Sequence, residues 1–153
     1  MSTPEERMRE LGIELPEAVA PVASYVSAAR TGSLVYTAGQ IPLVKGELGA
    51  TGKVGAEVSA EEAARQARIC ALNAIAALKA EVGELSRVVR IVKVVGFVAS
   101  APDFDGQPQV MNGASDVLVE VFGEAGKHAR SAVGVAVLPR NVPVEVELIA
   151  EIG

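Results

Sequence analysis

The most regular pattern of apolar and polar residues predicts a long α-helix near the middle of the chain. Apolar residues recur there at spacings of three and four, namely Ala64, Ala67, Ala71, Ile75, Leu78 and Val82. Ser59 and Glu62 have the spacing of an N-terminal capping box, and Gly83 favours a stop at the other end. The helix is therefore predicted to fill the segment between Ser59 and Gly83.

Two further helices are predicted. Thr3 can cap a short amphipathic helix that runs to Leu11, and Pro4 suits its first turn. The second main helix is predicted over Val110–Phe122, with Gly123 as its stop.

Runs of β-forming residues predict a hairpin and an inner strand. Residues 25–29 and 34–37 are separated by the turn-forming residues 31–33, which is typical of a hairpin. Residues 88–98 are apolar on both faces apart from two cations, which suits an inner strand of a sheet. The glycine-rich stretch 44–58 is predicted to be a loop with room for one short strand.

The chain ends in two predicted strands, about residues 130–138 and 142–149, which are joined by a turn at Pro139, Arg140 and Asn141. This order predicts a second hairpin. A tight turn would pair residues whose numbers sum to about 281, so Ala136 would lie beside Glu145.

The predicted C-terminal hairpin has one branched face and one small-residue face. The branched residues and Ser131, which shares their face, are expected to lie under the helices: Ser131, Val133, Val135, Val137, Val142, Val144, Val146 and Leu148. The opposite face carries glutamates together with Arg130, Ala132, Gly134 and Ala136. Since a solvated face usually carries longer polar side chains, we expect another surface to cover it; relief of crowding at a twist is the alternative.

The same register separates two charged residues of the hairpin. It places Arg130 opposite roughly Glu151 and about 20 Å from Glu145, at ~3.4 Å per residue. Within one chain, Arg130 and Glu145 would then not reach the same small molecule. A site that uses both residues would have to lie between subunits.

The order of the predicted elements indicates an α+β fold. Helix, hairpin, long helix, strand, helix and hairpin together predict a two-layer sandwich, with the two main helices on one face of a mixed β-sheet. At 153 residues, half of them hydrophobic, the chain fits a single domain over residues 1–153. Residues 1–20 are interpreted as an N-terminal helical extension.

Composition and charge argue against several classes of function. The net charge of -5 disfavours a nucleic-acid-binding protein, and aromatic residues at 3% offer few platforms for stacking bases. Cys70 lacks a disulfide partner and fits the core, while His128 alone cannot form a His/Cys metal cluster and is expected to be solvated. No apolar run reaches the roughly 18 residues of a membrane helix, so we expect a cytoplasmic protein.

Two segments at opposite ends of the chain resemble the signatures of the RidA/YjgF family. The N-terminal signature ends in a Gly-Gln-Ile-Pro element and is similar to residues 25–42, YVSAARTGSLVYTAGQIP. The C-terminal signature opens with an arginine-serine pair and runs through Leu-Pro to a V-E-V-E-like strand. It is similar to residues 130–152, RSAVGVAVLPRNVPVEVELIAEI. The resemblance covers roughly residues 20–152.

The resemblance implies a chorismate-mutase-like fold, a homotrimer and three clefts at the subunit interfaces. The implied activity is hydrolysis of reactive enamines or imines, which converts 2-imino acids to 2-keto acids and ammonia. Arg130 matches the arginine that binds the substrate carboxylate, and Glu145 matches the glutamate that positions water. An imine carbon is electrophilic, so this chemistry requires no metal or organic cofactor.

The resemblance also implies four substrate-binding positions. Tyr25 matches the tyrosine that lines the cleft, and Gly39 matches the glycine whose backbone contacts the substrate. Ala38 and Ala132 stand where the family often has a small hydroxyl residue and a cysteine. The helix before Arg130 lacks the family's asparagine-tyrosine pattern, although it contains an asparagine.

Other interpretations remain open at this point. Arg130 could neutralise Glu147 or Glu151 on a polar sheet face, and Tyr25 could pack at a strand edge. At the level of the whole protein, the alternatives are a non-catalytic small-molecule binder or chaperone-like trimer, and an endoribonuclease. The expected partners are a small carboxylate-bearing metabolite and further copies of the chain, with no nucleic acid and no membrane.

Overall fold

The computed structural model describes residues 2–18 and 20–153. In chain order the elements are α1 (Pro4–Leu11), β1 (Ala28–Thr31), β2 (Leu34–Thr37), β3 (Leu43–Val44), β4 (Glu47–Leu48), α2 (Ala60–Val82), η1 (Leu85–Arg87), β5 (Val88–Ala99), α3 (Gln107–Phe122), η2 (Gly123–Gly126), β6 (Ala129–Val135), η3 (Pro139–Asn141) and β7 (Val144–Ile152), where η marks a 3-10 helix. Residues 1 and 19 lie outside the described part of the chain.

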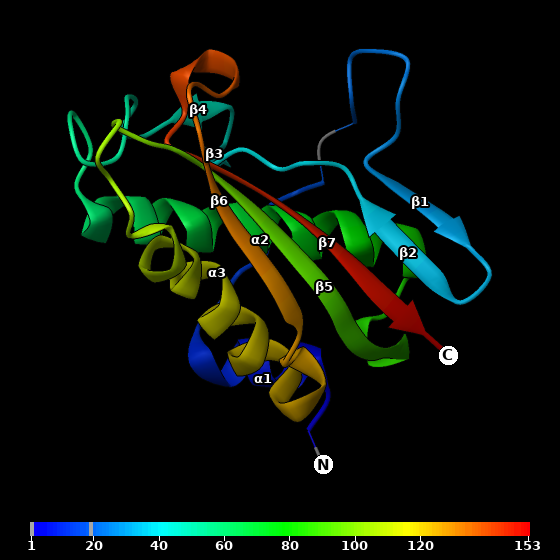
Figure 1. The fold of residues 1–153 in the computed structure, drawn as a ribbon. Coiled ribbons are helices and arrows are strands. Elements are labelled where there is room, and N and C mark those ends of the chain that lie inside the picture. Colours follow the sequence, from blue (N-terminus) through cyan, green and yellow to red (C-terminus); the bar gives the residue numbers. More distant parts are fainter. Residues whose placement is uncertain (1, 19) are drawn as a thin grey trace.

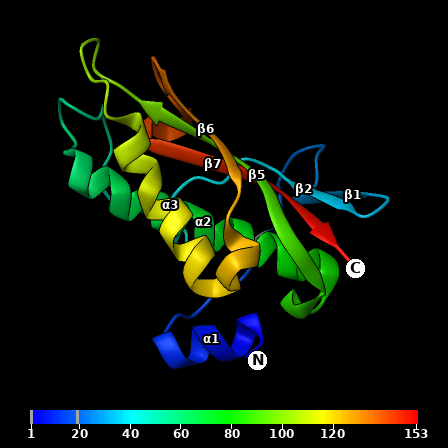
Figure 2. The same cartoon turned by 60° about the horizontal axis from the view of Figure 1, so that its bottom comes forward.

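The elements form two layers, which confirms the predicted α+β sandwich. The main sheet has the strand order β1-β2-β7-β5-β6 (Figure 1) and is mixed, since β5 and β6 are parallel while the other pairs are antiparallel. Helices α2 and α3 cover one face of this sheet, and α1 lies beneath α3 (Figure 2). Strands β3 and β4 make a separate small hairpin. Within the described residues, each helix is too short or too polar to cross a bilayer.

Helix α2 begins and ends where the sequence predicts, although half of its capping box is missing. The Ser59 hydroxyl accepts a hydrogen bond from the Glu62 backbone N–H, and Gly83 closes the helix. The Glu62 carboxylate does not bond to the Ser59 backbone N–H, because it accepts hydrogen bonds from Arg65 and Gln66 farther along the helix. The predicted reciprocal capping box is therefore wrong, but the predicted start is confirmed.

Helix α1 has the complete capping box and is fixed to the rest of the chain by one carboxylate. Thr3 and Glu6 cap each other's backbone N–H groups. The Glu5 carboxylate accepts hydrogen bonds from Lys79 Nζ at 2.8 Å and from the Leu85 backbone N–H at 2.9 Å. Burial alone would raise the pKa of Glu5, but these two hydrogen bonds outweigh it and hold that pKa below its usual value.

The predicted N-terminal hairpin is confirmed, but it is shorter than expected. Strands β1 and β2 pair from Ala28 opposite Thr37 to Thr31 opposite Leu34. Tyr25 therefore lies outside the strand that was predicted to contain it. Helix α3 begins at Gln107, three residues before its predicted start.

The predicted C-terminal hairpin is wrong, because β6 and β7 are not neighbours. Strand β5 lies between them: Val94 pairs with Arg130 of β6 in parallel, and Phe97 pairs with Glu145 of β7 in antiparallel orientation. The turn at Pro139–Asn141 reverses the chain as predicted, but a local turn does not decide which strand lies next in the sheet. Strand β5 forms hydrogen bonds along both edges and is the predicted inner strand.

The face assignment is confirmed for β7 and wrong for β6. Buried and half-buried residues alternate along β7, with Val144, Val146 and Leu148 buried under the helices. In β6 the small residues share this helix-facing side, because Ala132 pairs with the buried Gly96 and packs against the core. The branched Val133 lies on the uncovered face and is 45% exposed.

Strand β6 lies close to α3 and to the loop that precedes α3, which explains its small residues. A Cβ atom added at Gly134 would lie 2.9 Å from the Gln107 side chain and 3.1 Å from Ser100 Oγ. Relief of crowding, the alternative interpretation, therefore accounts for Gly134. The predicted pairs Ala136–Glu145 and Arg130–Glu151 are also wrong. Both glutamates pair with β5 instead, Glu145 with Phe97 and Glu151 with Arg90.

The core between the layers is apolar and closely packed. Cys70 is fully buried in it, as predicted, and burial raises the pKa of its thiol. Helices α2 and α3 approach so closely that a Cβ atom at Gly113 would collide with the Ala64 carbonyl oxygen. At Gly96 of β5, an added Cβ atom would instead collide with the side chain of Met111.

These two glycines give a prediction about stability. Glycine to alanine inside a helix ordinarily stabilises by about 0.5–1 kcal/mol. We expect Gly113→Ala to lower the free energy of unfolding instead, by about 1–3 kcal/mol, because the backbone at Ala64 cannot yield without separating the helices. Gly96→Ala is the matched control and should cost less, since a methionine side chain can change rotamer. Denaturant unfolding measures both, and a Gly113→Ala protein as stable as the parent would contradict the close helix contact.

Candidate functional site

The first group of candidate residues lies where the segment after β2 meets β7. The Gln40 N–H donates to the Val146 carbonyl at 2.8 Å, and the Val146 N–H donates to the Gln40 carbonyl at 3.0 Å. This bridge places Gly39 directly against the Glu145 side chain, so that a Cβ atom at Gly39 would collide with Glu145 Oε2. Any larger residue at this position would displace the Glu145 carboxylate from where it lies.

Glu145 differs in its electrostatics from an ordinary surface glutamate. It is half-buried on the uncovered face of the sheet, with Glu147 on the same side of β7. Burial, and to a smaller extent the charge of Glu147, raises the pKa of Glu145. Its carboxylate therefore accepts a proton more readily than an exposed one, as a general base in a reaction requires.

The second group is centred on Arg130 at the start of β6, on the helix side of the sheet. Its Nη1 donates to Asn112 Oδ1 at 2.9 Å and to Ser115 Oγ at 3.1 Å, both on α3. Within residues 2–18 and 20–153, no acceptor bonds to its Nε or Nη2, and no carboxylate pairs with it. The interpretation that Arg130 neutralises Glu147 or Glu151 is wrong, because those glutamates lie on the opposite face.

His128 belongs to the same group, although the sequence pattern did not indicate it. Its Nε2 lies 2.9 Å from Ser115 Oγ and its Nδ1 lies 2.6 Å from the Gly126 carbonyl oxygen, so it is not the solvated residue that was expected. A cleft of about 240 Å³ is lined by Ser115, Val119, Lys127, His128 and Arg130. The available signals were weak: Ser115 is three residues from Asn112 on one helix face, and His128 precedes Arg130 by two.

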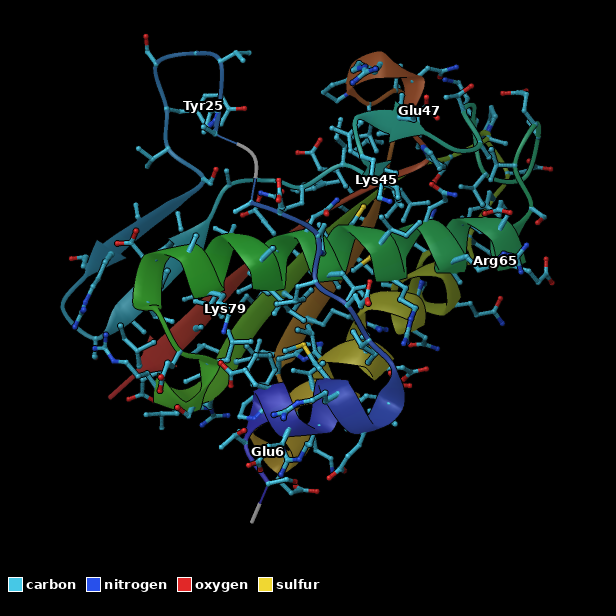
Figure 3. The ribbon with its side chains drawn as sticks, turned by 180° about the vertical axis from the view of Figure 1, so that it is seen from behind. Glu6, Tyr25, Lys45, Glu47, Arg65 and Lys79 are labelled. Carbon is cyan, nitrogen blue, oxygen red and sulfur yellow. The ribbon has the colours of Figure 1, made fainter. Side chains whose placement is uncertain are left out.

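The remaining candidates are spread over both groups. Tyr25 lies on the loop before β1 and is 60% exposed, which excludes packing at a strand edge (Figure 3). Ala38 adjoins Gly39, and its N–H donates to the Ser27 carbonyl at 2.8 Å. Ala132 faces the helices close to Arg130. Ala38 and Gly39 thus belong to the Glu145 side, and Ala132 to the Arg130 side.

The sheet separates the two groups within one chain. Glu145 and Val133 pair with the same residue of β5, so Glu145 lies about 10 Å along the strands from Arg130, at ~3.3 Å per residue. Two strand spacings add about 10 Å across the sheet, at ~4.8 Å each. The two side chains also point to opposite faces. A small molecule cannot contact Arg130 and Glu145 of the same chain.

A larger cleft lies at the other end of β6 and contains none of these residues. Its volume is about 430 Å³, and its lining includes Lys53, Ser100, Gln107 and Ala136. The polar groups there already bond within the protein, since Gln107 donates to Ser100 Oγ at 3.2 Å and Lys53 donates to the Ala136 carbonyl at 2.6 Å.

Comparison with known proteins gives consistent matches over nearly the whole chain. The model of the family described as "YjgF/chorismate mutase-like, putative endoribonuclease" matches residues 5–152. Protein TCP17 of Trypanosoma cruzi is 45% identical over 148 residues, which cover 95% of this chain and 91% of TCP17.

Solved structures agree with this match. The structure of Atu1372 from Agrobacterium tumefaciens is similar with a TM-score of 0.91 and 46% identity, covering 98% of this chain and 92% of that one. The structure of E. coli TdcF with bound serine has a TM-score of 0.63 and 29% identity, covering 91% of this chain and 94% of that one. The likeness of fold therefore extends over nearly the whole chain.

Proposed function

This chain belongs to the YjgF/chorismate mutase-like family, and from that premise we propose that it hydrolyses reactive 2-imino acids, or the enamines in equilibrium with them, to 2-keto acids and ammonia. In this proposal Arg130 holds the substrate carboxylate. Glu145 positions the attacking water and accepts its proton. The reaction takes place in clefts between subunits, and the protein is a homotrimer.

The arrangement of Arg130 is the observation that carries the proposal. Its Nη1 is held by Asn112 and Ser115, which fixes the plane of the guanidinium group. The Nε and Nη2 groups form the edge that binds a carboxylate through two parallel hydrogen bonds, and no described residue occupies that edge. The serine bound in E. coli TdcF is itself a small carboxylate, which supports a ligand of this class.

Glu145 supplies the second requirement of imine hydrolysis. Water adds to the electrophilic imine carbon, a carboxylate takes the water proton, and the nitrogen leaves as ammonia after it has been protonated. The raised pKa of Glu145 suits a group that must take up and return a proton. Its contact with Gly39 limits the positions that the carboxylate can adopt.

The need for a second subunit follows from the separation of the two groups. If Arg130 and Glu145 act on one molecule, they must come from different chains. The uncovered sheet face supports assembly, since it exposes the apolar Val133 beside the half-buried Phe97. A head-to-tail contact of this kind can close into a ring, and the family resemblance implies a ring of three copies.

A non-catalytic carboxylate binder would use the same free edge of Arg130, and release of ammonia distinguishes it from an enzyme. An endoribonuclease is less consistent with a net charge of -5. Incubation with RNA at physiological salt tests that alternative directly.

The proposed anchor predicts the effect of Arg130→Lys. Lysine keeps the charge but lacks the paired donors, so we expect kcat/KM on 2-imino acids to fall by about a hundredfold, as a misplacement of about 1 Å can cause. The thermal midpoint should change little. Imines generated by an amino-acid oxidase, with ammonia as the readout, give the rate. Arg68→Lys, a surface change in α2, is the matched control, and wild-type turnover in Arg130→Lys would refute the anchor.

The proposed assembly predicts about three chains per particle in light scattering. Val133→Asp should shift the particle towards the monomer while circular dichroism stays unchanged, because the side chain lies on the uncovered face. Val44→Asp, at a 50% exposed valine of the separate small hairpin, is the control and should leave the particle intact. A stable parent monomer at micromolar concentration would contradict the trimer and the shared cleft.

A further inference from the structure

The hydrogen bonds around His128 determine which of its nitrogens carries the proton. Nδ1 lies 2.6 Å from the Gly126 carbonyl oxygen, which can only accept a hydrogen bond, so Nδ1 must be protonated. In the neutral ring Nε2 then carries the lone pair. The hydroxyl of Ser115, 2.9 Å away, donates its hydrogen to Nε2.

This assignment gives a continuous chain of hydrogen bonds that ends at the proposed anchor. Arg130 Nη1 donates to Ser115 Oγ, Ser115 donates to His128 Nε2, and His128 Nδ1 donates to Gly126. In this state the only hydroxyl hydrogen of Ser115 points at the imidazole. It is therefore not available to a ligand in the cleft that Ser115, His128 and Arg130 line together.

Protonation of His128 reverses the middle of this chain. Nε2–H then donates to Ser115 Oγ, which already accepts from Arg130, and the serine hydrogen is free to turn towards the cleft. The protonated site thus gains one hydrogen-bond donor and one positive charge beside the free edge of Arg130. Both changes favour a bound anion.

The charged groups around the ring oppose protonation when the cleft contains no anion. Arg130 on β6 and Lys127 beside η2 both line the cleft, although Lys127 also pairs with Glu124 at 2.9 Å. Lys93 of β5 points to the other face, where it donates to Ser131. Burial, opposed by the Gly126 hydrogen bond and assisted by Arg130, lowers the pKa of His128. An anion on Arg130 would neutralise the nearest positive charge and make protonation easier.

We propose that Ser115 and His128 are part of the carboxylate-binding site, and that a carboxylate on Arg130 binds together with a proton on His128, with Ser115 donating a hydrogen bond to the ligand. The inference rests on the proposed function only in taking Arg130 as the carboxylate anchor. Because coupling between two sites is reciprocal, the proton strengthens carboxylate binding by the same factor as the carboxylate strengthens proton binding.

Calorimetric titration with pyruvate, the simplest 2-keto acid, tests the coupling on the intact protein. Between about pH 8 and about pH 5 pyruvate keeps its charge, so a change in Kd reports on the protein. We expect the affinity for pyruvate to rise at least about fivefold over this range, which is the lower end of the factors by which two coupled binding sites usually affect each other. When the titration is repeated in buffers of different ionisation enthalpy, the measured binding enthalpy should change with the buffer, because binding takes up protons.

Three variants assign the effect. His128→Asn should abolish the pH dependence, and Ser115→Ala should reduce both the affinity and the pH dependence, whereas Ser115→Thr keeps the hydroxyl and should retain both. Glu145→Gln should keep the pH dependence, which excludes that carboxyl as its source. Pyruvate binding that depends on Arg130 but not on pH, or whose pH dependence survives in His128→Asn, would overturn the coupling and leave the anchor standing. No binding at any pH would overturn both.

Discussion

The double pairing of β5 decides where Arg130 and Glu145 lie. Because β5 forms hydrogen bonds to β6 along one edge and to β7 along the other, it holds these two strands apart in a fixed register. The parallel pairing with β6 turns Arg130 towards α3. The antiparallel pairing with β7 turns Glu145 to the face that no helix of the described chain covers. One strand thus separates two residues that the proposed reaction brings to the same molecule.

The close packing of the layers explains the local chemistry on each side. On the helix side, small residues of β6 let α3 approach, and this brings Asn112 and Ser115 within hydrogen-bonding distance of Arg130. On the other side, Gly39 leaves room for the Glu145 carboxylate, whose partial burial raises its pKa. Gly134 and Gly39 therefore have comparable roles on the two faces of the sheet, since each leaves room for a polar side chain in crowded surroundings.

Sequence patterns predicted the elements better than their pairing. The start of α1 and both ends of α2 followed from Thr3, Ser59 and Gly83, because caps act over a few neighbouring residues. The C-terminal hairpin was wrong because strand order depends on contacts between distant segments, here β5 with residues more than thirty positions away. The proposed anchor Arg130 was identified through the family resemblance. His128 and Ser115 were not, since a lone histidine has no motif and its partner comes from another element.

Subunit complementation tests the central claim, that Arg130 of one chain and Glu145 of another form one site. Arg130→Lys and Glu145→Gln chains, each inactive alone, are mixed, dissociated and reassembled, and ammonia release is measured. If each site takes one residue from each of two neighbours, random mixing restores about a quarter of the sites. Recovery towards that level is the predicted result. No recovery from reassembled particles of the wild-type size would contradict a site shared between chains.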